Sequence, residues 1–282
     1  MSIFDILKQS NFKFKKNLGQ NFITDKNILA SICADSQVSK SDIVLEIGAG
    51  AGTLTLMLAQ IAERVIAFEI DETLKPVLSE VLKDSNTAEI KYLNVLKASD
   101  EEISALTENR PFKVVANLPY YITAPLIMRF IESTLPVQSL TLTLQKEVAE
   151  RITALPGSSE YGSITLAVKI FGDPQITRIL KRDCFIPSPN VDSAVVHIKK
   201  RTTPIIVKDI AVLRKLIRAG FAMRRKTLVN NIATIFNVDK NSIKQDIGKL
   251  GFLQTVRGED LSLEEYIKIA DFLVDMNYAT NH

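Results

Sequence analysis

The sequence predicts a large α/β domain followed by a smaller domain made only of helices. Three observations support this prediction. Up to residue 203, short apolar runs typical of buried strands alternate with longer amphipathic stretches. After residue 203 only helical periodicity remains. The chain has 282 residues, more than one domain usually contains, so we expect domains at 1–203 and 204–282.

The first domain is expected to begin with a basic arm at residues 1–20. This segment holds four lysines against one acid, with phenylalanines between them. Thr24-Asp25 then follows as the cap of a helix that extends to about residue 33. An oxygen at this position can accept hydrogen bonds from the first helical turn.

A sheet of seven strands is expected at the centre of this domain. Its strands are apolar runs or alternate apolar with polar residues, whereas helices repeat apolar residues three and four positions apart. In chain order we expect strand 43–47, helix 54–61, strand 65–68, strand 89–93, helix and loop 100–110, strand 114–116, helix 125–131, strand 139–144, helices 145–152 and 164–171, and a closing antiparallel pair at 176–180 and 192–199. The helical domain should contain helices 208–222, 227–236, 241–250 and 263–277.

Composition limits the classes of protein to which the chain can belong. No run of 18 uncharged apolar residues is present, and the first residues lack the order of a secretory signal, so no membrane association is expected. Cys33 and Cys184 lie far apart, and His197 and His282 do not cluster, so we expect no metal site and no His-dependent mechanism. The sparse cysteines suggest a reducing compartment, and we expect a cytoplasmic protein.

Basic residues are concentrated in two segments, although the net charge is only +3. Residues 200–230 hold nine Lys or Arg against the single acid Asp209, and the basic arm is the other segment. Solvated helix faces are often rich in lysine, but two separate clusters favour a partner with a phosphate backbone. The residues expected to contact it are Lys15, Lys16, Arg214, Lys215, Arg218, Arg224, Arg225 and Lys226.

The run Asn117-Leu118-Pro119-Tyr120 follows a predicted strand, where ligands of α/β sheets bind. Asn117 offers a carbonyl acceptor, and the Leu118 carbonyl, followed by a proline without an N–H, offers another. Tyr120 offers a ring for stacking. These groups suit a planar ring with an exocyclic amine, and the simpler alternative is an Asn-Pro turn beside a core tyrosine. Phe185, in a proline-stiffened loop, is placed to project a second ring, or else to fill the core.

Three alternating glycines, Gly48, Gly50 and Gly52, follow the strand at 43–47. Their spacing differs from the Gly-x-Gly-x-x-Gly of dinucleotide enzymes, which disfavours an NAD-linked oxidoreductase. Glu69 ends the next strand, and a carboxylate there can accept both hydroxyls of an adenosine ribose. Together these features favour a cofactor that contains a nucleoside.

In order and spacing, these motifs resemble those of the rRNA adenine N6,N6-dimethyltransferases. The resemblance covers about residues 12–275 and is carried by Leu18-Gly19-Gln20-Asn21-Phe22, the glycine loop with Glu69, Asn117-Leu118-Pro119-Tyr120 and Phe185-Ile186-Pro187-Ser188-Pro189. The run from Phe221 to Asn231 makes the branch that acts on small-subunit (16S) rRNA the most similar. The resemblance implies a Rossmann-like, seven-stranded, S-adenosylmethionine-dependent methyltransferase domain and an all-helical rRNA-binding domain.

The resemblance also implies roles for individual residues. Asn117, Leu118 and Pro119 would orient the target amine, while Tyr120 and Phe185 would hold the adenine between them. The cofactor would contact Asn21, Ile23, Gly48, Gly50, Gly52, Glu69, Asn94 and Asn117. The family pattern has an aspartate where this chain has Asn94, so the charge-assisted part of the hydrogen bond to the cofactor's adenine is lost.

The implied reaction transfers methyl groups to the exocyclic N6 of two adjacent adenines in a hairpin loop near the 3′ end of small-subunit rRNA. The product would be N6,N6-dimethyladenosine, the partner an immature 30S subunit, and the enzyme a monomer. Two other hypotheses stay open. One is a large-subunit rRNA methyltransferase that confers macrolide resistance, and the other is a non-catalytic RNA-binding factor that retains the fold.

Overall fold

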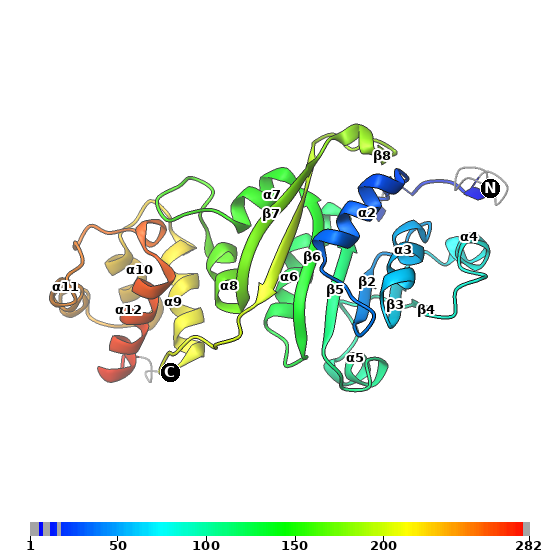
Figure 1. Cartoon of the computed structure of the whole chain (residues 1–282). Coiled ribbons are helices and arrows are strands. Elements are labelled where there is room, and N and C mark those ends of the chain that lie inside the picture. The colour runs from blue at the N-terminus through cyan, green and yellow to red at the C-terminus, as the bar shows by residue number, and fades with distance from the viewer. Residues whose placement is uncertain (1–5, 8–11, 16–17, 279–282) are drawn as a thin grey trace. The chain divides into compact units, whose positions relative to one another are not determined.

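The computed structural model describes residues 6–7, 12–15 and 18–278. Contacts divide the chain into two compact units, and Figure 1 shows their elements. The first unit comprises residues up to 149 together with 173–200, and the second comprises 150–172 together with the residues from 201 on. This division differs from the boundary expected at 203 mainly in the segment 150–172, and at the boundary itself by three residues. The segment groups with the C-terminal helices because Tyr161 and Leu166 lie in their hydrophobic core.

The first unit contains a sheet of seven strands, as expected. The strands are β2 (Ile43–Ile47), β3 (Arg64–Glu69), β4 (Ala88–Tyr92), β5 (Phe112–Asn117), β6 (Val137–Gln145), β7 (Gly172–Leu180) and β9 (Ser193–Lys200). Their spatial order is β4-β3-β2-β5-β6-β9-β7. The first five strands in this spatial order, β4, β3, β2, β5 and β6, are parallel. Strand β9 runs antiparallel to β6.

The register of the parallel strands brings their carboxyl ends together. Ile47, at the end of β2, pairs with Phe68 of β3 on one side and with Ala116 of β5 on the other. Strands β3 and β4 lie on one side of β2, and β5 and β6 lie on the other. The direction in which successive strands follow one another across the sheet therefore reverses between β2 and β5. Open α/β sheets bind ligands at such a reversal, beyond the carboxyl ends of the strands.

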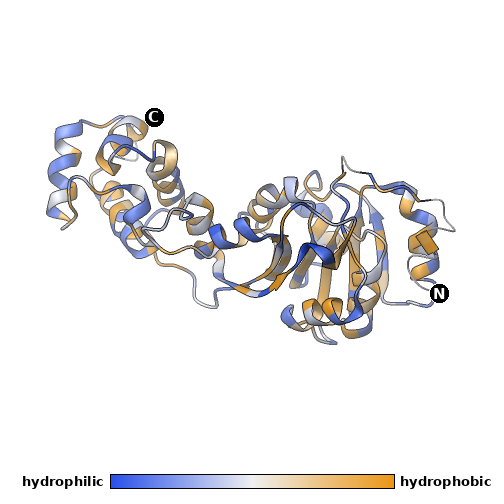
Figure 2. Ribbon diagram, turned by 90° about the horizontal axis from the view of Figure 1, so that it is seen from above, coloured by the Kyte–Doolittle hydropathy of each residue, from blue (hydrophilic) through white to orange (hydrophobic). Residues whose placement is uncertain are grey.

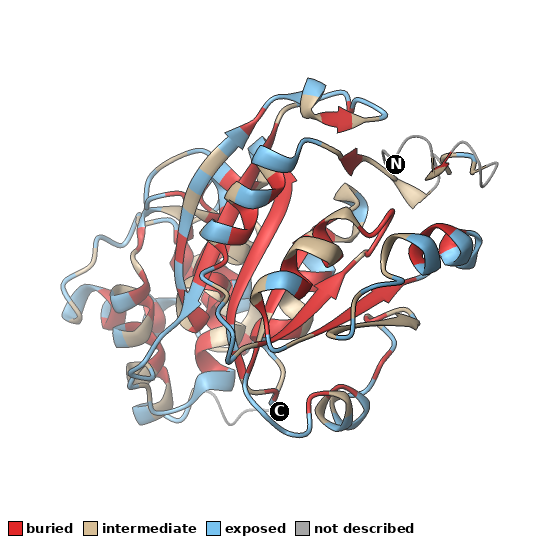
Figure 3. Cartoon of the chain, turned by 45° about the vertical axis from the view of Figure 1, so that its right-hand side comes forward, coloured by how far each residue is buried: buried red, intermediate tan, exposed pale blue. Residues whose placement is uncertain are grey.

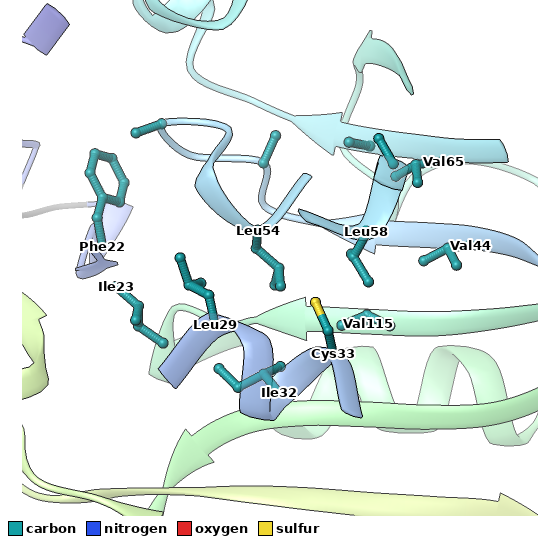
Figure 4. Close-up of a cluster of buried hydrophobic side chains, with 14 of the residues drawn as sticks. Phe22, Ile23, Leu29, Ile32, Cys33, Val44, Leu54, Leu58, Val65 and Val115 are labelled. Atoms are coloured by element: carbon teal, nitrogen blue, oxygen red, sulfur yellow. The ribbon is translucent and has the colours of Figure 1, made fainter. Parts of the chain in front are cut away.

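Helices cover this sheet and bury its apolar side chains. They are α2 (Lys26–Asp35), α3 (Thr53–Ile61), α4 (Lys75–Val81), α5 (Asp100–Leu106), α6 (Thr123–Ile131) and α7 (Lys146–Ile152). The carboxylate of Asp25 caps α2, as expected, by accepting from the N–H groups of Asn27 and Ile28. Figure 3 shows the central strands as buried, and Figure 4 shows Leu29 and Cys33 of α2 pointing toward Leu54 and Leu58 of α3.

A second, two-stranded sheet joins distant parts of the first unit. Strand β1 (Phe22–Ile23) pairs antiparallel with β8 (Phe185–Ile186), which places Ile23 opposite Phe185. Phe185 is only 3% exposed and lies in the same core cluster as Phe22. The expectation that Phe185 projects its ring is therefore wrong for this structure. Two-residue strands are too short to show periodicity, so no pattern in the sequence indicates this pairing.

The second unit is entirely helical, as expected after residue 203. Its helices are α8 (Ser163–Phe171), α9 (Ile210–Ala222), α10 (Leu228–Phe236), α11 (Lys240–Lys249) and α12 (Leu263–Asp275). Ser262 and Glu265 form the capping box at the start of α12.

Figure 2 shows the strands of the sheet mainly in the hydrophobic colour, whereas helices carry both colours. Among the residues described, no helix is both long and apolar enough to cross a membrane.

Two glycines of the second unit make room for one buried tyrosine. The hydroxyl of Tyr266, which is fully buried, donates to Gly258 O at 3.0 Å. A Cβ atom added to Gly220 of α9 would lie 2.0 Å from this hydroxyl oxygen. A real Cβ cannot approach so closely, so α9 and α12 would have to move apart. Gly220 is therefore required for the packing of these two helices.

We predict that Gly220→Ala lowers the free energy of unfolding by about 1–3 kcal/mol, because an overpacked core forces side chains or backbone to shift. Gly248→Ala is the matched control within α11. Its Cβ would meet only Gln254 Nε2, at 3.6 Å, so alanine should raise stability by about 0.5–1 kcal/mol through helix propensity. Denaturant unfolding of both variants measures the difference. Equal effects in the two variants would contradict the packing argument.

Candidate active site

A cavity of about 280 Å³ lies at the carboxyl ends of the parallel strands. Its walls come from the N-terminal segment, the glycine loop after β2, the end of β3, the loop after β4 and the segment after β5. Nine of the residues expected to form the site line this one cavity: Asn21, Ile23, Gly48, Gly50, Glu69, Asn94, Asn117, Leu118 and Pro119. The structure therefore brings together five segments that are separate in the sequence.

The glycine loop has the backbone shape that its sequence predicts. Gly48, Gly50 and Gly52 have φ angles of +82°, +55° and +78°, a region that residues with a Cβ rarely adopt. A Cβ on Gly50 would lie 3.0 Å from the ring of Phe22. Gly52, in contrast, does not line the cavity. A Cβ there would meet Leu78 of α4 at 3.0 Å, so Gly52 allows α4 to pack closely where α3 begins.

The carboxylate of Glu69 fixes the position of this loop. Its Oε2 atom accepts from the N–H of Gly50 at 2.8 Å. Its Oε1 atom accepts from the N–H groups of Ile70 at 2.7 Å and Asp71 at 2.8 Å. A carboxylate oxygen has about two acceptor positions, so Oε1 is saturated and Oε2 keeps one for a ligand hydroxyl.

The loop after β4 contributes an amide and apolar surface. Oδ1 of Asn94 accepts from the N–H of Leu96 at 3.0 Å, which orients the side chain and leaves one lone pair of this oxygen for a ligand. Ile70 and Leu93, which also line the cavity, are 47% and 37% exposed. Apolar side chains open to a cavity suit the flat faces of an aromatic ring.

Asn117 and Leu118 present two acceptors to the cavity. Nδ2 of Asn117 donates to the backbone carbonyl of Asn21 at 2.9 Å. A carbonyl can only accept, so this contact identifies Nδ2 as the donating atom of the amide. The Oδ1 atom is then the one that can accept from a ligand. No described residue donates a hydrogen bond to Asn117 Oδ1 or to the Leu118 carbonyl, and Pro119 has no N–H to offer.

The two rings expected to hold an aromatic ligand do not line the cavity. The hydroxyl of Tyr120 is hydrogen-bonded to Ser193 Oγ at 2.9 Å, and burial raises the pKa of this tyrosine. Phe185 lies in the core. The neighbouring Tyr121, which we did not expect in the site, lines the cavity and is 58% exposed. Nothing in the spacing distinguishes two adjacent tyrosines, so only the three-dimensional structure separates them.

Glu46 is a second cavity residue that the sequence analysis did not identify. It is 1% exposed, and no described residue forms a hydrogen bond with its Oε2 atom. Burial, together with the nearby charge of Glu69, raises the pKa of Glu46 to about 8. An acid inside the apolar strand Ile43–Ile47 was the available signal, because buried strands rarely contain an unpaired carboxylate.

The lysines of the basic arm have different positions. Lys15, expected to contact nucleic acid, forms an ion pair with Asp71 at 2.6 Å beside the cavity. Gln20 donates to the other oxygen of Asp71 at 2.7 Å, so the N-terminal segment is attached to the end of β3. Lys16 lies outside the described residues.

The basic residues of the second unit divide into structural and accessible groups. Arg224 pairs with Glu259 at 2.9 Å and donates to the Ser159 carbonyl at 3.0 Å, so it joins two loops. Arg225 and Lys226 are exposed and line an open hollow at the start of α10. The other three residues expected to contact RNA lie on α9: Arg218 is exposed, Arg214 is half-buried, and Lys215 Nζ lies 4.6 Å from the ring centre of Phe236.

We predict that Glu46→Gln stabilises the protein increasingly as pH rises from about 5 to about 8. The raised pKa means that the folded state holds the Glu46 proton more tightly than the unfolded chain. Protonated Glu46 makes its full contribution to the free energy of unfolding below the ordinary pKa of 4.5, and this contribution is lost as pH rises through about 8. Glutamine has no such pH dependence. Thermal unfolding of both proteins over this pH range provides the test. Parallel pH profiles would show that Glu46 does not titrate in this way.

Comparisons with known proteins agree with this geometry. Residues 11–275 match the family model described as ribosomal RNA adenine dimethylase. The protein named ribosomal RNA small subunit methyltransferase A from Listeria monocytogenes is 42% identical over 278 residues, which cover 96% of this chain and 94% of that protein. The protein of the same name from Enterococcus faecalis is also 42% identical, over 95% of this chain and 93% of its own.

Solved structures show the same fold. A dimethyladenosine transferase from Plasmodium falciparum superposes with a TM-score of 0.75 at 25% identity, covering 92% of this chain and 98% of its own. The 23S rRNA methyltransferase ErmE superposes with a TM-score of 0.70 at 22% identity, covering 90% of this chain and all of its own, a likeness of fold alone. With its family match over nearly the whole length and its relatives at 42% identity, the chain belongs to the ribosomal RNA adenine dimethylases.

Proposed function

We propose that this protein transfers methyl groups from S-adenosylmethionine to the exocyclic N6 of two adjacent adenines in a hairpin loop near the 3′ end of small-subunit rRNA. The product is N6,N6-dimethyladenosine, formed during assembly of the subunit in the cytoplasm, and the enzyme acts as a monomer on an immature 30S particle. One observation carries the proposal. Asn117 and Leu118 line the cavity, and no described residue donates a hydrogen bond to Asn117 Oδ1 or to the Leu118 carbonyl.

The residues at the other end of the cavity fit the proposed cofactor. Gly48 and Gly50 line the wall without a side chain, and Glu69 Oε2 can accept from a ribose hydroxyl. Asn94 Oδ1 can accept from an adenine amine while Ile70 and Leu93 flank the ring. S-adenosylmethionine supplies an electrophilic methyl group on a positively charged sulfur.

The two acceptors after β5 have the chemistry that an aromatic amine requires. The lone pair of an adenine N6 is delocalised into the ring, which makes the amine a weak nucleophile. Hydrogen bonds from its two N–H groups to Asn117 Oδ1 and the Leu118 carbonyl favour a more pyramidal nitrogen whose lone pair can point toward the methyl carbon. The same oxygens stabilise the positive charge that develops on the nitrogen. Alignment of the reacting atoms supplies much of the remaining acceleration.

This mechanism needs no strong base before attack. The nitrogen becomes a positively charged, acidic ammonium after methyl transfer, and it loses its proton readily. A neutral amide at Asn117 also tolerates the second substrate, which carries one methyl group and one N–H. A fixed carboxylate at this position would accept hydrogen bonds but could not donate to the Asn21 carbonyl, as Asn117 Nδ2 does.

The target must enter the cavity as an unpaired base. Adenines in loops are accessible in this way, whereas stacked and paired bases are not. Arg225 and Lys226 are suited to hold phosphates of the rRNA because both side chains are exposed. Lys15 can contribute only by exchanging Asp71 for a phosphate, since the two residues form an ion pair.

The main rival is methylation of large-subunit rRNA. ErmE shares the fold, but at 22% identity this likeness says nothing about the substrate. The relatives at 42% identity favour the small subunit. Mass mapping of methylated adenines after incubation with unmethylated 30S or 50S subunits decides between them. Methyl transfer to neither particle would instead support a non-catalytic RNA-binding factor.

We predict that Asn117→Ala abolishes methyl transfer, because the adenine amine loses an acceptor at the reacting nitrogen. Affinity for S-adenosylmethionine should fall by no more than about tenfold, since Glu69 and the glycine loop are unchanged. Transfer of labelled methyl groups measures the first effect, and calorimetry measures the second. Undiminished turnover would remove Asn117 from the proposed mechanism.

We predict that the double variant Arg225→Gln/Lys226→Gln binds rRNA more weakly. If both cations contact phosphates, the slope of log affinity against log salt should become less steep by about 1.4–1.8. Arg224→Gln is the control. Arg224 forms an ion pair with Glu259, so this variant should lower the thermal stability of the second unit. An unchanged salt slope in the double variant would exclude the pair from the RNA interface.

A further inference from the structure

We propose that Asp71 is a positioning residue for methyl transfer, because it fixes the segment whose backbone orients the amide of Asn117. Asp71 holds Gln20, and the carbonyl of the next residue, Asn21, accepts from this amide. The inference rests on the proposed function, in which the amide accepts from the target amine. It extends that function to a residue that does not line the cavity and to which neither the motif spacing nor the family resemblance assigned a role.

The amide of Asn117 needs a partner that decides its orientation. The two ends of a carboxamide are similar in size, but one donates hydrogen bonds and the other accepts them. If the amide were flipped, it would offer N–H groups where the target amine also brings N–H groups, and no hydrogen bond could form. The bond from Asn117 Nδ2 to the Asn21 carbonyl at 2.9 Å opposes this flip. Methyl transfer therefore depends on the position of one backbone carbonyl.

The Asn21 carbonyl is held from both sides along the chain. After it, β1 pairs with β8, and Thr53 Oγ1 donates to the Ile23 carbonyl at 3.1 Å. Before it, Gln20 Nε2 donates to Asp71 Oδ2 at 2.7 Å. Because Gln20 directly precedes Asn21, a shift of one residue displaces the other.

The bond between Gln20 and Asp71 has a defined direction. The backbone N–H of Lys15 donates to Gln20 Oε1 at 2.8 Å, so the Nε2 end of the same amide faces Asp71. Lys15 Nζ also donates to Asp71 Oδ1, at 2.6 Å. An ionised carboxylate can accept at both oxygens, whereas an amide at this position would present a donor at one end.

Asp71 is buried and ionised. Its side chain is not exposed to solvent, and Thr73 donates to Oδ1 from its N–H at 3.1 Å and from its hydroxyl at 2.6 Å. Burial opposes ionisation, but the hydrogen bonds from Lys15, Thr73 and Gln20 outweigh it and hold the pKa of this carboxyl below its ordinary value. Buried charges require such partners. Two of the partners belong to the segment that carries Asn21.

The test replaces Asp71 by asparagine, which has nearly the same shape. An asparagine whose oxygen accepts from Lys15 and Thr73 turns its NH2 end toward Gln20 Nε2, so the bond to Gln20 is lost. Gln20→Leu removes the same bond from the other side, and it decides the question if Asp71→Asn does not fold. Thr73→Val is the matched control, because it removes a hydrogen bond to Asp71 that does not involve the N-terminal segment.

The first measurement is the NMR signal of the Asn117 side-chain amide in protein that contains isotope-labelled asparagine. Its absence from the spectrum of Asn117→Ser assigns the signal. We expect the signal to shift in Asp71→Asn and in Gln20→Leu, because the hydrogen bond to the Asn21 carbonyl is weakened. It should keep its native position in Thr73→Val.

The second measurement is steady-state methylation of unmethylated 30S subunits. Asp71→Asn and Gln20→Leu should lower kcat by about 10- to 100-fold, because the acceptor for the target amine is misplaced. The KM for the particle and the Kd for S-adenosylmethionine should change by less than about threefold. The backbone N–H of residue 71 still donates to Glu69 in the asparagine variant, so the cofactor end is kept. Thr73→Val should retain the native kcat.

Three results would overturn the inference. One is a native Asn117 signal in both Asp71→Asn and Gln20→Leu, and another is a native kcat in variants whose signal has shifted. The third is a loss of kcat in Thr73→Val as large as in Asp71→Asn, since the effect would then arise in the turn after β3. The NMR measurement needs no turnover, so it separates this inference from the proposed function, which fails if the native enzyme does not methylate adenine in the 30S particle.

Discussion

The hydrogen bonds of one carboxylate, that of Glu69, hold the parts of the cavity in place. One oxygen binds the backbone of the glycine loop, and the other binds the turn that follows β3. That turn contains Asp71, which attaches Lys15 and Gln20 of the N-terminal segment. The end of a single strand therefore organises two loops and the segment that lies over them. If this carboxylate were lost, three separate pieces of the cavity wall would lose their common anchor.

Several of the residues that line the cavity carry oxygen acceptors. Asn117 and Leu118 contribute carbonyl oxygens at one end, Glu69 contributes a carboxylate at the other, and Glu46 lies buried nearby. Such a site favours ligands that donate hydrogen bonds or carry positive charge. An aromatic amine and a sulfonium centre are both ligands of this kind. The electrostatic character of the wall and the proposed chemistry are thus consistent with each other.

The sequence predicts those features that depend on local patterns, and it fails for those that depend on contacts between distant segments. Apolar runs located the strand ends, so the positions of Glu69 and Asn117 at one edge could be expected. The burial of Phe185 could not, because it depends on a strand partner more than 160 residues away in the chain. The ion pair of Arg224 with Glu259 also joins distant loops, so no local pattern indicates it.

The path of the chain between the two units has a practical consequence. Residues 150–172 leave the first unit, pack into the second, and return to form β7 at the edge of the sheet. Leu166 is fully buried against residues that follow position 203, such as Leu213. A chain truncated after residue 203 would lack the helices that pack against α8, and the apolar side of α8 would be exposed to water. The first unit cannot be isolated by a single cut, because residues 150–172 of the second unit lie in the chain between its two parts.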